Sequence, residues 1–222
     1  MTDTMITVQG RFSSYYPPER ATVEIGVGFE GPDRESVFSD TVASADVIRE
    51  LVKSRHLPNA GPVTWWSSDS VQVWSTKPWN VEGEQLPLVF HSRVGFTVKF
   101  SDFEELSRVI EEVAVIDGVT VGNISWDLTE ARKTAVIAEV RSRAVKDAVA
   151  KASVYAQSIG LGSVRAVALA DPGMLGDRVG TSGADGGYSS MRMMAAGSAP
   201  ELSLTPEDIE VVAIVDAKFI AS

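Results

Sequence analysis

Hydrophobic and polar residues alternate with a period of two in several stretches of the chain, a pattern that predicts β-strands. The clearest alternation runs from Phe90 to Phe100, where the even-numbered positions are mostly hydrophobic and the odd-numbered ones polar or glycine. One side of that strand is therefore expected to face a core and the other to face away from it. Further strands are expected at about 6–12, 20–30, 61–77, 119–128, 163–170 and 207–220.

Two stretches between these strands have helical spacing. The first spans about 33–55, and Asp33 after a Gly-Pro pair is expected to cap its N-terminus. The second is a short helix of about 12 residues. The sequence SDFE predicts a capping box for it, with Ser101 as the cap and Glu104 reaching back.

A third, longer helix is expected at about 129–159, closed by Gly160. Small residues dominate its expected buried stripe, so the helix can lie close to a sheet or another helix. That stripe comprises Ala131, Ala135, Ala138, Ala144, Ala148, Ala152, Tyr155 and Ile159.

The expected element order is β-β-α-β-β-α-β-α-β-β, with hairpins that imply antiparallel pairing. The fold class is therefore α+β, a mainly antiparallel sheet packed by two to three helices, in a single domain of residues 1–222. Residues 172–206 interrupt the pattern with a long Gly/Met-rich loop. Seven glycines lie between 173 and 197, and four of the six methionines fall in this segment.

The hexapeptide GVGFEG at residues 26–31 has the G-x-G-x-x-G spacing of a dinucleotide-binding loop. Such a loop must join a strand to a helix, with the helix N-terminus facing the phosphates. Here the alternation continues through the first two glycines, so Gly26 and Gly28 are expected inside a strand. Glycines at such positions permit close packing or mark a bulge, and no cofactor is expected.

Composition narrows the classes of function. The net charge of -10 disfavours nucleic-acid binding, because phosphate contacts need a positive surface. There is no cysteine, which removes disulfides and thiolate chemistry. No hydrophobic run approaches the length of a membrane span, and MTDTMITVQG does not read as a signal peptide. We expect a cytoplasmic protein; the alternative is an exported chain that has already been processed.

The order of several local phrases resembles the SIMPL domain family, also called DUF541. The resemblance covers nearly the whole chain and implies an α+β fold. It also implies a bacterial protein, often exported, with loose links to stress responses or the envelope, and a tendency to self-associate. It supplies no catalytic residue. The matching phrases are ITVQG at 6–10, PPERATVEIGVGFEG at 17–31, the strand at 90–100 followed by SDFEEL, DGVTVGNISWDLTEARK at 117–133 and PEDIEVVAIVDAKF at 206–219.

Candidate catalytic and metal-binding groups are few. His56 and His91 are the only imidazoles, and they are far apart in sequence with no ligand-spaced acids. The segment TSGADGG at 181–187 lacks the strand and helix of a nucleophile turn. We therefore expect no catalytic residue and no metal site. An unrecognised enzyme would need a pocket gathering carboxylates such as Glu24, Asp69 or Asp127.

Binding is the better-supported class. Trp65 and Trp66 are adjacent in a strand, so one can be buried while the other is exposed; Trp79 is expected to be the most exposed. The methionines at 191–196 suit an adaptable contact surface. The third helix is locally basic, which we interpret as a solvated face rather than a docking face. Its basic residues are Arg132, Lys133, Arg141, Arg143, Lys146 and Lys151.

These features favour a non-catalytic protein that acts through self-assembly, as a homo-oligomer, or through a protein partner. The loop at 172–206 and the segment from Trp65 to Trp79 are the expected contact regions. The alternative is a binder of small molecules or glycans that uses exposed tryptophans such as Trp74 or Trp79. An enzyme is the third possibility.

Overall fold

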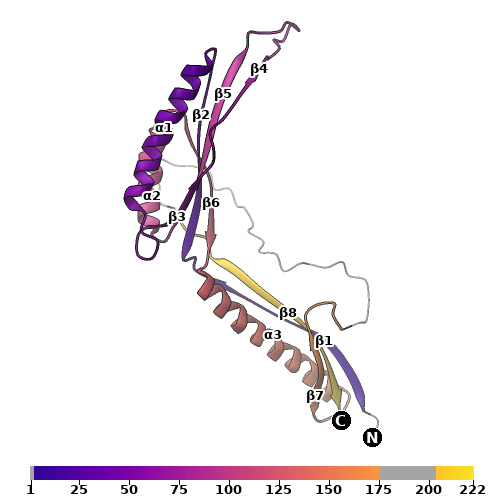
Figure 1. Cartoon of the computed structure of the whole chain (residues 1–222). Coiled ribbons are helices and arrows are strands. Elements are labelled where there is room, and N and C mark those ends of the chain that lie inside the picture. The colour runs from indigo at the N-terminus through magenta and orange to yellow at the C-terminus, as the bar shows by residue number, and fades with distance from the viewer. Residues whose placement is uncertain (1–2, 176–203) are drawn as a thin grey trace. The chain divides into compact units, whose positions relative to one another are not determined.

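The computed structural model describes residues 3–175 and 204–222, which form two compact units (Figure 1). In the described chain, unit 1 comprises residues 3–17, 128–175 and 208–222, and unit 2 comprises residues 18–127 and 204–207. The α+β class and the mainly antiparallel pairing are confirmed. The expectation of one domain over residues 1–222 stays a prediction.

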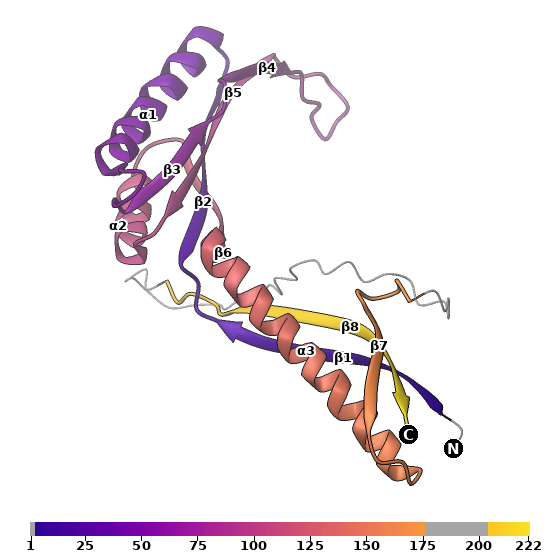
Figure 2. The same ribbon diagram turned by 60° about the horizontal axis from the view of Figure 1, so that its bottom comes forward.

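Unit 1 contains a three-stranded antiparallel sheet in the order β1-β8-β7. These strands are β1 (Thr4–Tyr16), β8 (Ile209–Ala221) and β7 (Val164–Ala170). The long helix α3 (Glu130–Ser158) covers one face of this sheet (Figure 2). Strands β1 and β8 pair over all 13 residues of each, from Thr4–Ala221 to Tyr16–Ile209.

The backbones of α3 and β1 approach each other closely at Gly10. A Cβ atom placed on Gly10 would lie 2.1 Å from the carbonyl oxygen of Ala144 and 2.8 Å from the Cβ of Ala148. Only glycine fits at this point of β1, because any side chain would meet the helix backbone. The expectation that small residues let α3 lie close to a sheet is confirmed here.

The buried stripe of α3 differs from the expected one in its first half. The buried positions are Val136, Val140, Ala144, Ala148, Ala152 and Ala156. The expected positions Ala131, Ala135 and Ala138, together with Tyr155 and Ile159, are exposed. Small size does not identify the buried face, because alanine is tolerated on either face of a helix. In the structure, the larger Val136 and Val140 lie on the buried face in this half of α3. Gly160, with φ of 80°, closes the helix as expected.

Unit 2 is built on a larger antiparallel sheet in the order β3-β5-β2-β6, and β4 pairs with β5 as well. Helices α1 (Arg34–Arg55) and α2 (Phe103–Ala114) cover one face of this sheet (Figure 1). The core between the helices and the sheet holds large side chains, among them Phe96, Phe100, Ile48 and Leu106. The strands are β2 (Arg20–Gly31), β3 (Val63–Ser68), β4 (Gln72–Thr76), β5 (Val89–Phe100) and β6 (Val119–Asp127).

Aspartates cap both helices of unit 2. Asp33 accepts a hydrogen bond from the backbone N–H of Ser36, which confirms the expected cap of α1. The expected capping box at Ser101 is wrong: Asp102 is the N-cap of α2, and its side chain accepts from the N–H groups of Glu104 and Glu105. The hydroxyl of Ser101 instead donates to the carbonyl of Gly61, which ties the end of β5 to the turn before β3.

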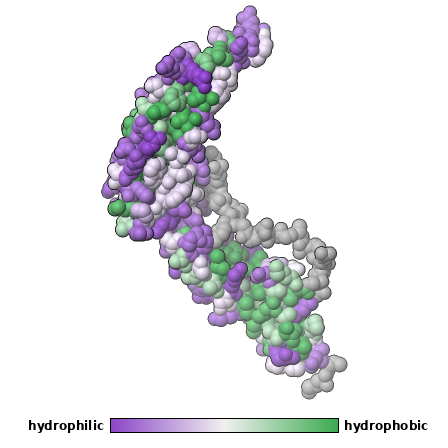
Figure 3. Space-filling model, in the orientation of Figure 1, coloured by the Kyte–Doolittle hydropathy of each residue, from purple (hydrophilic) through white to green (hydrophobic). Residues whose placement is uncertain are grey.

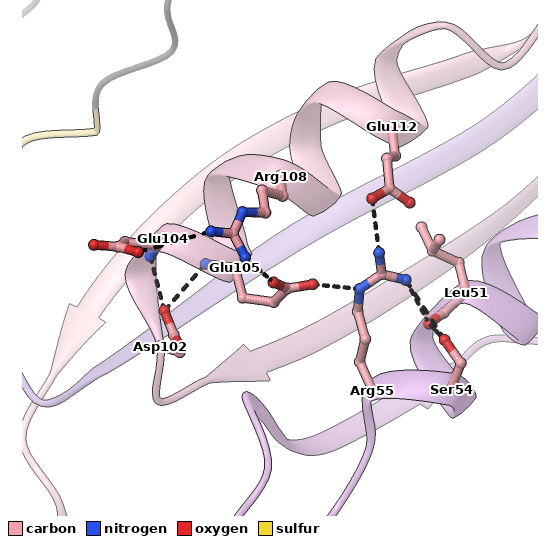
Figure 4. A network of polar contacts seen from close by, with 8 residues as sticks. All are labelled: Leu51, Ser54, Arg55, Asp102, Glu104, Glu105, Arg108 and Glu112. Atoms are coloured by element: carbon pink, nitrogen blue, oxygen red, sulfur yellow. Dashed lines mark hydrogen bonds and ion pairs between the residues drawn. The ribbon is translucent and has the colours of Figure 1, made fainter.

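A charged network joins α1 to α2 (Figure 4). Arg55 donates from Nε to Glu105 Oε1 over 2.5 Å and from Nη2 to Glu112 Oε1 over 2.7 Å. Arg108 adds a second donor to Glu105 at 3.0 Å. The hydrogen bond to Arg55 holds the pKa of Glu105 below its usual value, and the bond to Glu105 raises the pKa of Arg55.

The single long strand expected at 61–77 is wrong. The chain forms two strands, β3 and β4, separated by Asp69–Val71, and both pair with β5. The break lies beside Gly95, whose carbonyl accepts a hydrogen bond from the N–H of Asp69 over 2.9 Å. Alternation alone could not reveal the break, because Val71 and Val73 keep the period of two across it. Most of the expected loop at 172–206 lies outside the described residues.

Candidate interaction surfaces

The face of the unit 2 sheet opposite its helices is polar and is not covered by either helix (Figure 1). The alternation in β5 places His91, Arg93, Gly95, Thr97 and Lys99 on this face, as the sequence predicts. Directly paired residues of antiparallel strands share a face, so the register extends the same surface across the neighbouring strands. It adds Gln72, Trp74, Trp65 and Ser67 from β4 and β3, and Thr22, Glu24, Gly26 and Thr120 from β2 and β6.

A pocket of about 400 Å³ lies at the centre of this open face. Its floor crosses three strands, because Gly95 of β5 pairs with Gly26 of β2, and Gly26 pairs with Thr120 of β6. Neither of these adjacent glycines has a side chain that would fill the pocket at that point. The glycines that resemble a nucleotide loop in sequence therefore lie inside β2, as expected, and Gly26 shapes the floor of a pocket.

The break between β3 and β4 supplies one wall of the pocket. Asp69 carries its carboxylate over Gly95: a Cβ atom at Gly95 would lie 2.7 Å from Asp69 Oδ2. The adjoining wall residues include Ser70 and Gln72. A side chain at residue 95 would displace the Asp69 carboxylate from this place.

Three charged side chains converge on the pocket. Glu24 and Asp69 bring carboxylates, and Arg93 brings a guanidinium whose Nη2 lies 3.5 Å from the Cβ position of Gly26. Across residues 3–175 and 204–222, none of these three side chains makes a hydrogen bond or ion pair. Two of the three carboxylates named from the sequence are thus brought together, while Asp127 does not line the pocket.

Two exposed tryptophans, Trp65 and Trp74, lie on the same open face. Trp65 is 49% exposed and pairs with Lys99, whereas Trp66 turns to the other face and packs against the core, as the sequence predicts. Trp74 is 45% exposed and stacks on His91 with ring centroids 5.3 Å apart. Trp79, at 67%, is the most exposed of the five tryptophans.

His91 is held on both ring nitrogens. Nδ1 lies 3.3 Å from Glu30 Oε2, and Nε2 lies 2.8 Å from Thr76 Oγ1. These contacts and the stacked indole fix the imidazole beside Trp74. His56 lies at the C-terminal end of α1, where its backbone N–H donates to the carbonyl of Lys53. In the part of the chain that the structure describes, no cluster of His, Asp and Glu could hold a metal ion.

Unit 1 carries a different candidate surface, at the edge of β8. Strand β7 is shorter than β8 and pairs with it only from Ala221 to Asp216. In the described chain, Ile209–Val215 therefore has β1 as its one hydrogen-bonded neighbour. The backbone groups of Arg11 point away from β8, and Ile214 is its direct partner. By alternation, the N–H and C=O groups of Glu210, Val212 and Ile214 point to the open edge.

The outer edge of β1 is shielded, in contrast. Asp147 of α3 accepts from the backbone N–H of Arg11 over 2.9 Å, and Lys151 donates to the carbonyl of Gln9 over 3.0 Å. Asp147 and Lys151 also pair with each other at 2.7 Å. The hydrogen bond from Lys151, and then that from Arg11, holds the pKa of Asp147 below its usual value. A covered edge of this kind resists pairing with another strand.

A second pocket, of about 270 Å³, lies beside the open part of β8. Its lining is mainly hydrophobic, with Ala144 and Val145 from α3, Leu169 from the end of β7, and Ile214 and Val215 from β8. Figure 3 shows hydrophobic side chains gathered over the part of unit 1 that contains β7 and β8. The pocket exists because β7 ends before it can cover the space between α3 and β8.

Two of the basic residues of α3 contact aromatic rings of unit 1. Arg143 and Arg132 of α3 lie over the rings of Phe12 and Tyr16, at 5.2 and 5.5 Å from the centroids, so they pack against their own unit. The segments 181–187 and 191–196 lie outside the described residues. Within the described chain, no helix has the length and hydrophobicity needed to span a membrane.

The comparisons with known proteins place the chain in a family. No curated protein matches the sequence. A family model described as "SIMPL: Protein of unknown function (DUF541)" matches residues 6–219, which include elements of both units from β1 to β8. The family description gives no activity, so the surfaces above carry the functional argument. With nearly its whole length matched, the chain belongs to the SIMPL family.

Proposed function

We propose that this protein acts by non-catalytic binding, and that it assembles with a second copy of itself through the open edge of β8. The observation that carries the proposal is the run Ile209–Val215, which has backbone groups directed outward and a strand on only one side. An exposed row of backbone donors and acceptors is a template for another strand. Native β-sheet proteins usually cover or blunt such an edge.

The edge is complementary to itself. Two copies related by a two-fold axis at Val212 would pair antiparallel, with Glu210 opposite Ile214 and Ile209 opposite Val215, so no like charges face each other. This arrangement forms up to about six backbone hydrogen bonds, each contributing about 0.5–1.5 kcal/mol. It also brings Ile209 of the partner subunit beside the hydrophobic pocket next to Val215.

Side chains support the same edge. Val212 is 40% exposed on the face of the sheet opposite α3, and pairing would cover it. The competing edge of β1 is blocked at its centre by Asp147 and Lys151. Pairing of the open segment of β8 with the same segment of a second copy gives a closed dimer, because each copy uses the same segment and one pairing consumes both.

The test is the solution mass of the full chain, measured by light scattering after size exclusion at about 100 μM, a concentration that populates even weak assemblies. Val212→Pro removes one outward N–H without breaking the pairing with β1 and should convert a dimer to single chains. Val212→Thr keeps that N–H and should remain dimeric.

Ser13→Pro supplies a matched control at the other edge of the sheet. The backbone N–H of Ser13 points to the outer edge of β1, away from β8. Proline at this position should therefore leave the mass of the dimer unchanged. A wild-type chain that is monomeric under these conditions, or a Val212→Pro variant that stays dimeric with native circular dichroism, would contradict the proposal.

A further inference from the structure

The central pocket of the unit 2 sheet lies on a face that plays no part in the proposed pairing of β8. Its floor lies at Gly26 and Gly95, and it is lined by the charged residues Glu24, Asp69 and Arg93. The structure assigns this pocket to a hydroxyl-rich ligand: we propose that it binds a neutral sugar unit of an oligosaccharide.

Glycines line the pocket at three positions, so no side chain of their own fills it there. At Gly95 the carboxylate of Asp69 occupies the place of a side chain, and the N–H of Asp69 is fixed to the carbonyl of Gly95. Across the sheet, a Cβ atom at Gly122 would lie 3.1 Å from the carbonyl oxygen of Glu24. Glycine in the middle of a strand weakens the strand and often marks a place where a ligand approaches the backbone closely.

The charged groups around this floor are not satisfied by one another. In residues 3–175 and 204–222, Glu24, Asp69 and Arg93 form no ion pair, although all three line the same pocket. A polar ligand placed among them could accept from the guanidinium and donate to both carboxylates. Hydrogen bonds to charged groups are shorter and stronger than those between neutral groups.

The balance of charge selects the ligand class. Two carboxylates and one guanidinium sum to -1, so a phosphate or carboxylate ligand would meet net repulsion. A zinc site would need at least three protein ligands, and the described residues contain no such cluster. Sugar hydroxyls both donate and accept, which matches carboxylates, a guanidinium and the side chains of Gln72, Thr97 and Thr120 on the same walls.

Two aromatic rings extend the surface along β5. Trp74 pairs with His91, and Trp65 pairs with Lys99. His91 and Lys99 each lie four residues along β5 from Gly95, which is about 13 Å along the strand. The C–H groups of a pyranose ring pack on the flat face of an indole. Stacking on His91 orders the Trp74 ring before a ligand binds, so less side-chain entropy is lost on binding. A sugar in the pocket with neighbours along the strand would reach these rings.

Tryptophan fluorescence gives a direct test, because all five tryptophans lie in unit 2. The full chain is titrated with chitotetraose, cellotetraose and maltotetraose, each up to about 10 mM, a range that covers weak sugar affinities. Saturable quenching or a spectral shift with at least one of them is expected. Isothermal titration calorimetry with the same sugar provides a second readout.

A pair of glycine substitutions localises the binding. Gly26→Ala adds a methyl group to the pocket floor, where the nearest heavy atoms are 3.5 Å away or more, so the fold tolerates it. It should weaken binding at least tenfold. Gly28→Ala makes the same change one row along β2, outside the pocket lining, and should leave the affinity within about twofold.

Three results would overturn the assignment. The first is no signal with any of the three tetrasaccharides. The second is equal affinity for the wild type and Gly26→Ala. The third is displacement of the bound sugar by millimolar inorganic phosphate, which would show an anion site at Arg93. Because the mass of the chain is measured separately with Val212→Pro, failure of this site and failure of the proposed dimer are distinguishable.

Discussion

Unit 1 and unit 2 both place helices on one face of an antiparallel sheet, but they fill the layer between helix and sheet differently. Unit 1 brings the backbone of α3 against β1 through Gly10 and a line of alanines. Unit 2 separates its helices from the sheet with large side chains such as Phe96 and Phe100. The stability of unit 1 should therefore be sensitive to substitutions that add atoms at the helix–sheet contact. The stability of unit 2 should be sensitive to substitutions that remove atoms from its core.

The largest expected effect comes from removing bulk in unit 2. Phe100 is completely buried, so Phe100→Ala should cost about 3–5 kcal/mol through lost burial and a cavity. The measurement is urea unfolding followed by tryptophan fluorescence, which reports unit 2 alone. Phe38→Ala, on the exposed side of α1, is the matched control and should cost less than about 1 kcal/mol. Similar losses for both variants would mean that Phe100 is not a core contact.

The opposite change tests unit 1. Gly10→Ala puts a methyl group against the carbonyl of Ala144, and overpacking of this kind costs about 1–3 kcal/mol. Far-UV circular dichroism should show an early loss of helix, while the tryptophan transition of unit 2 stays in place.

Gly162→Ala is the control for that experiment within unit 1. The nearest atom to the added methyl group would be the carbonyl oxygen of Ser222 at 3.7 Å, an ordinary contact. Its stability should remain within about 0.5 kcal/mol of the wild type. If Gly10→Ala is as stable as Gly162→Ala, the close approach of α3 and β1 does not hold unit 1 together.

The smallest effect concerns charge at the helices of unit 2. The pKa of Glu105 is held below its usual value of 4.5 by Arg55, so its contribution is full above that pH and is lost as the pH falls through the lowered pKa. Glu105→Gln should therefore destabilise unit 2 at pH 7 by about 1 kcal/mol or less, and by a smaller amount as the pH falls. Urea unfolding at pH 7 and pH 3, read by tryptophan fluorescence, measures both values.

Glu111 provides the comparison for Glu105. It is exposed on the same helix and, within the described chain, makes no ion pair, so Glu111→Gln should have the same small effect at both pH values. A Glu105→Gln variant whose deficit persists unchanged at pH 3 would show that shape rather than charge is responsible. The ion pair between α1 and α2 would then add nothing beyond the hydrophobic layer.

Features that depend on neighbouring residues could be predicted from the sequence. The alternation in β5, the two faces of Trp65 and Trp66, the cap at Asp33 and the closing Gly160 all follow from spacing of a few positions. The α+β class follows from the order of such elements. Local patterns succeed here because side-chain direction in a strand or helix is set by the backbone alone.

Features that depend on residues distant in the sequence are fixed by the folded chain. Alanines fit any face of α3, so the partner sheet chose which positions are buried. Ser101 and Asp102 are both residue types that cap helices. The hydroxyl of Ser101 donates to the distant carbonyl of Gly61, and Asp102 caps α2 instead.

The break at Asp69 lies beside Gly95 of β5, and the open edge of β8 depends on where β7 stops. Both candidate surfaces arise from these pairings between residues far apart in the chain, and periodicity along the chain does not encode which strands meet or where a pairing ends.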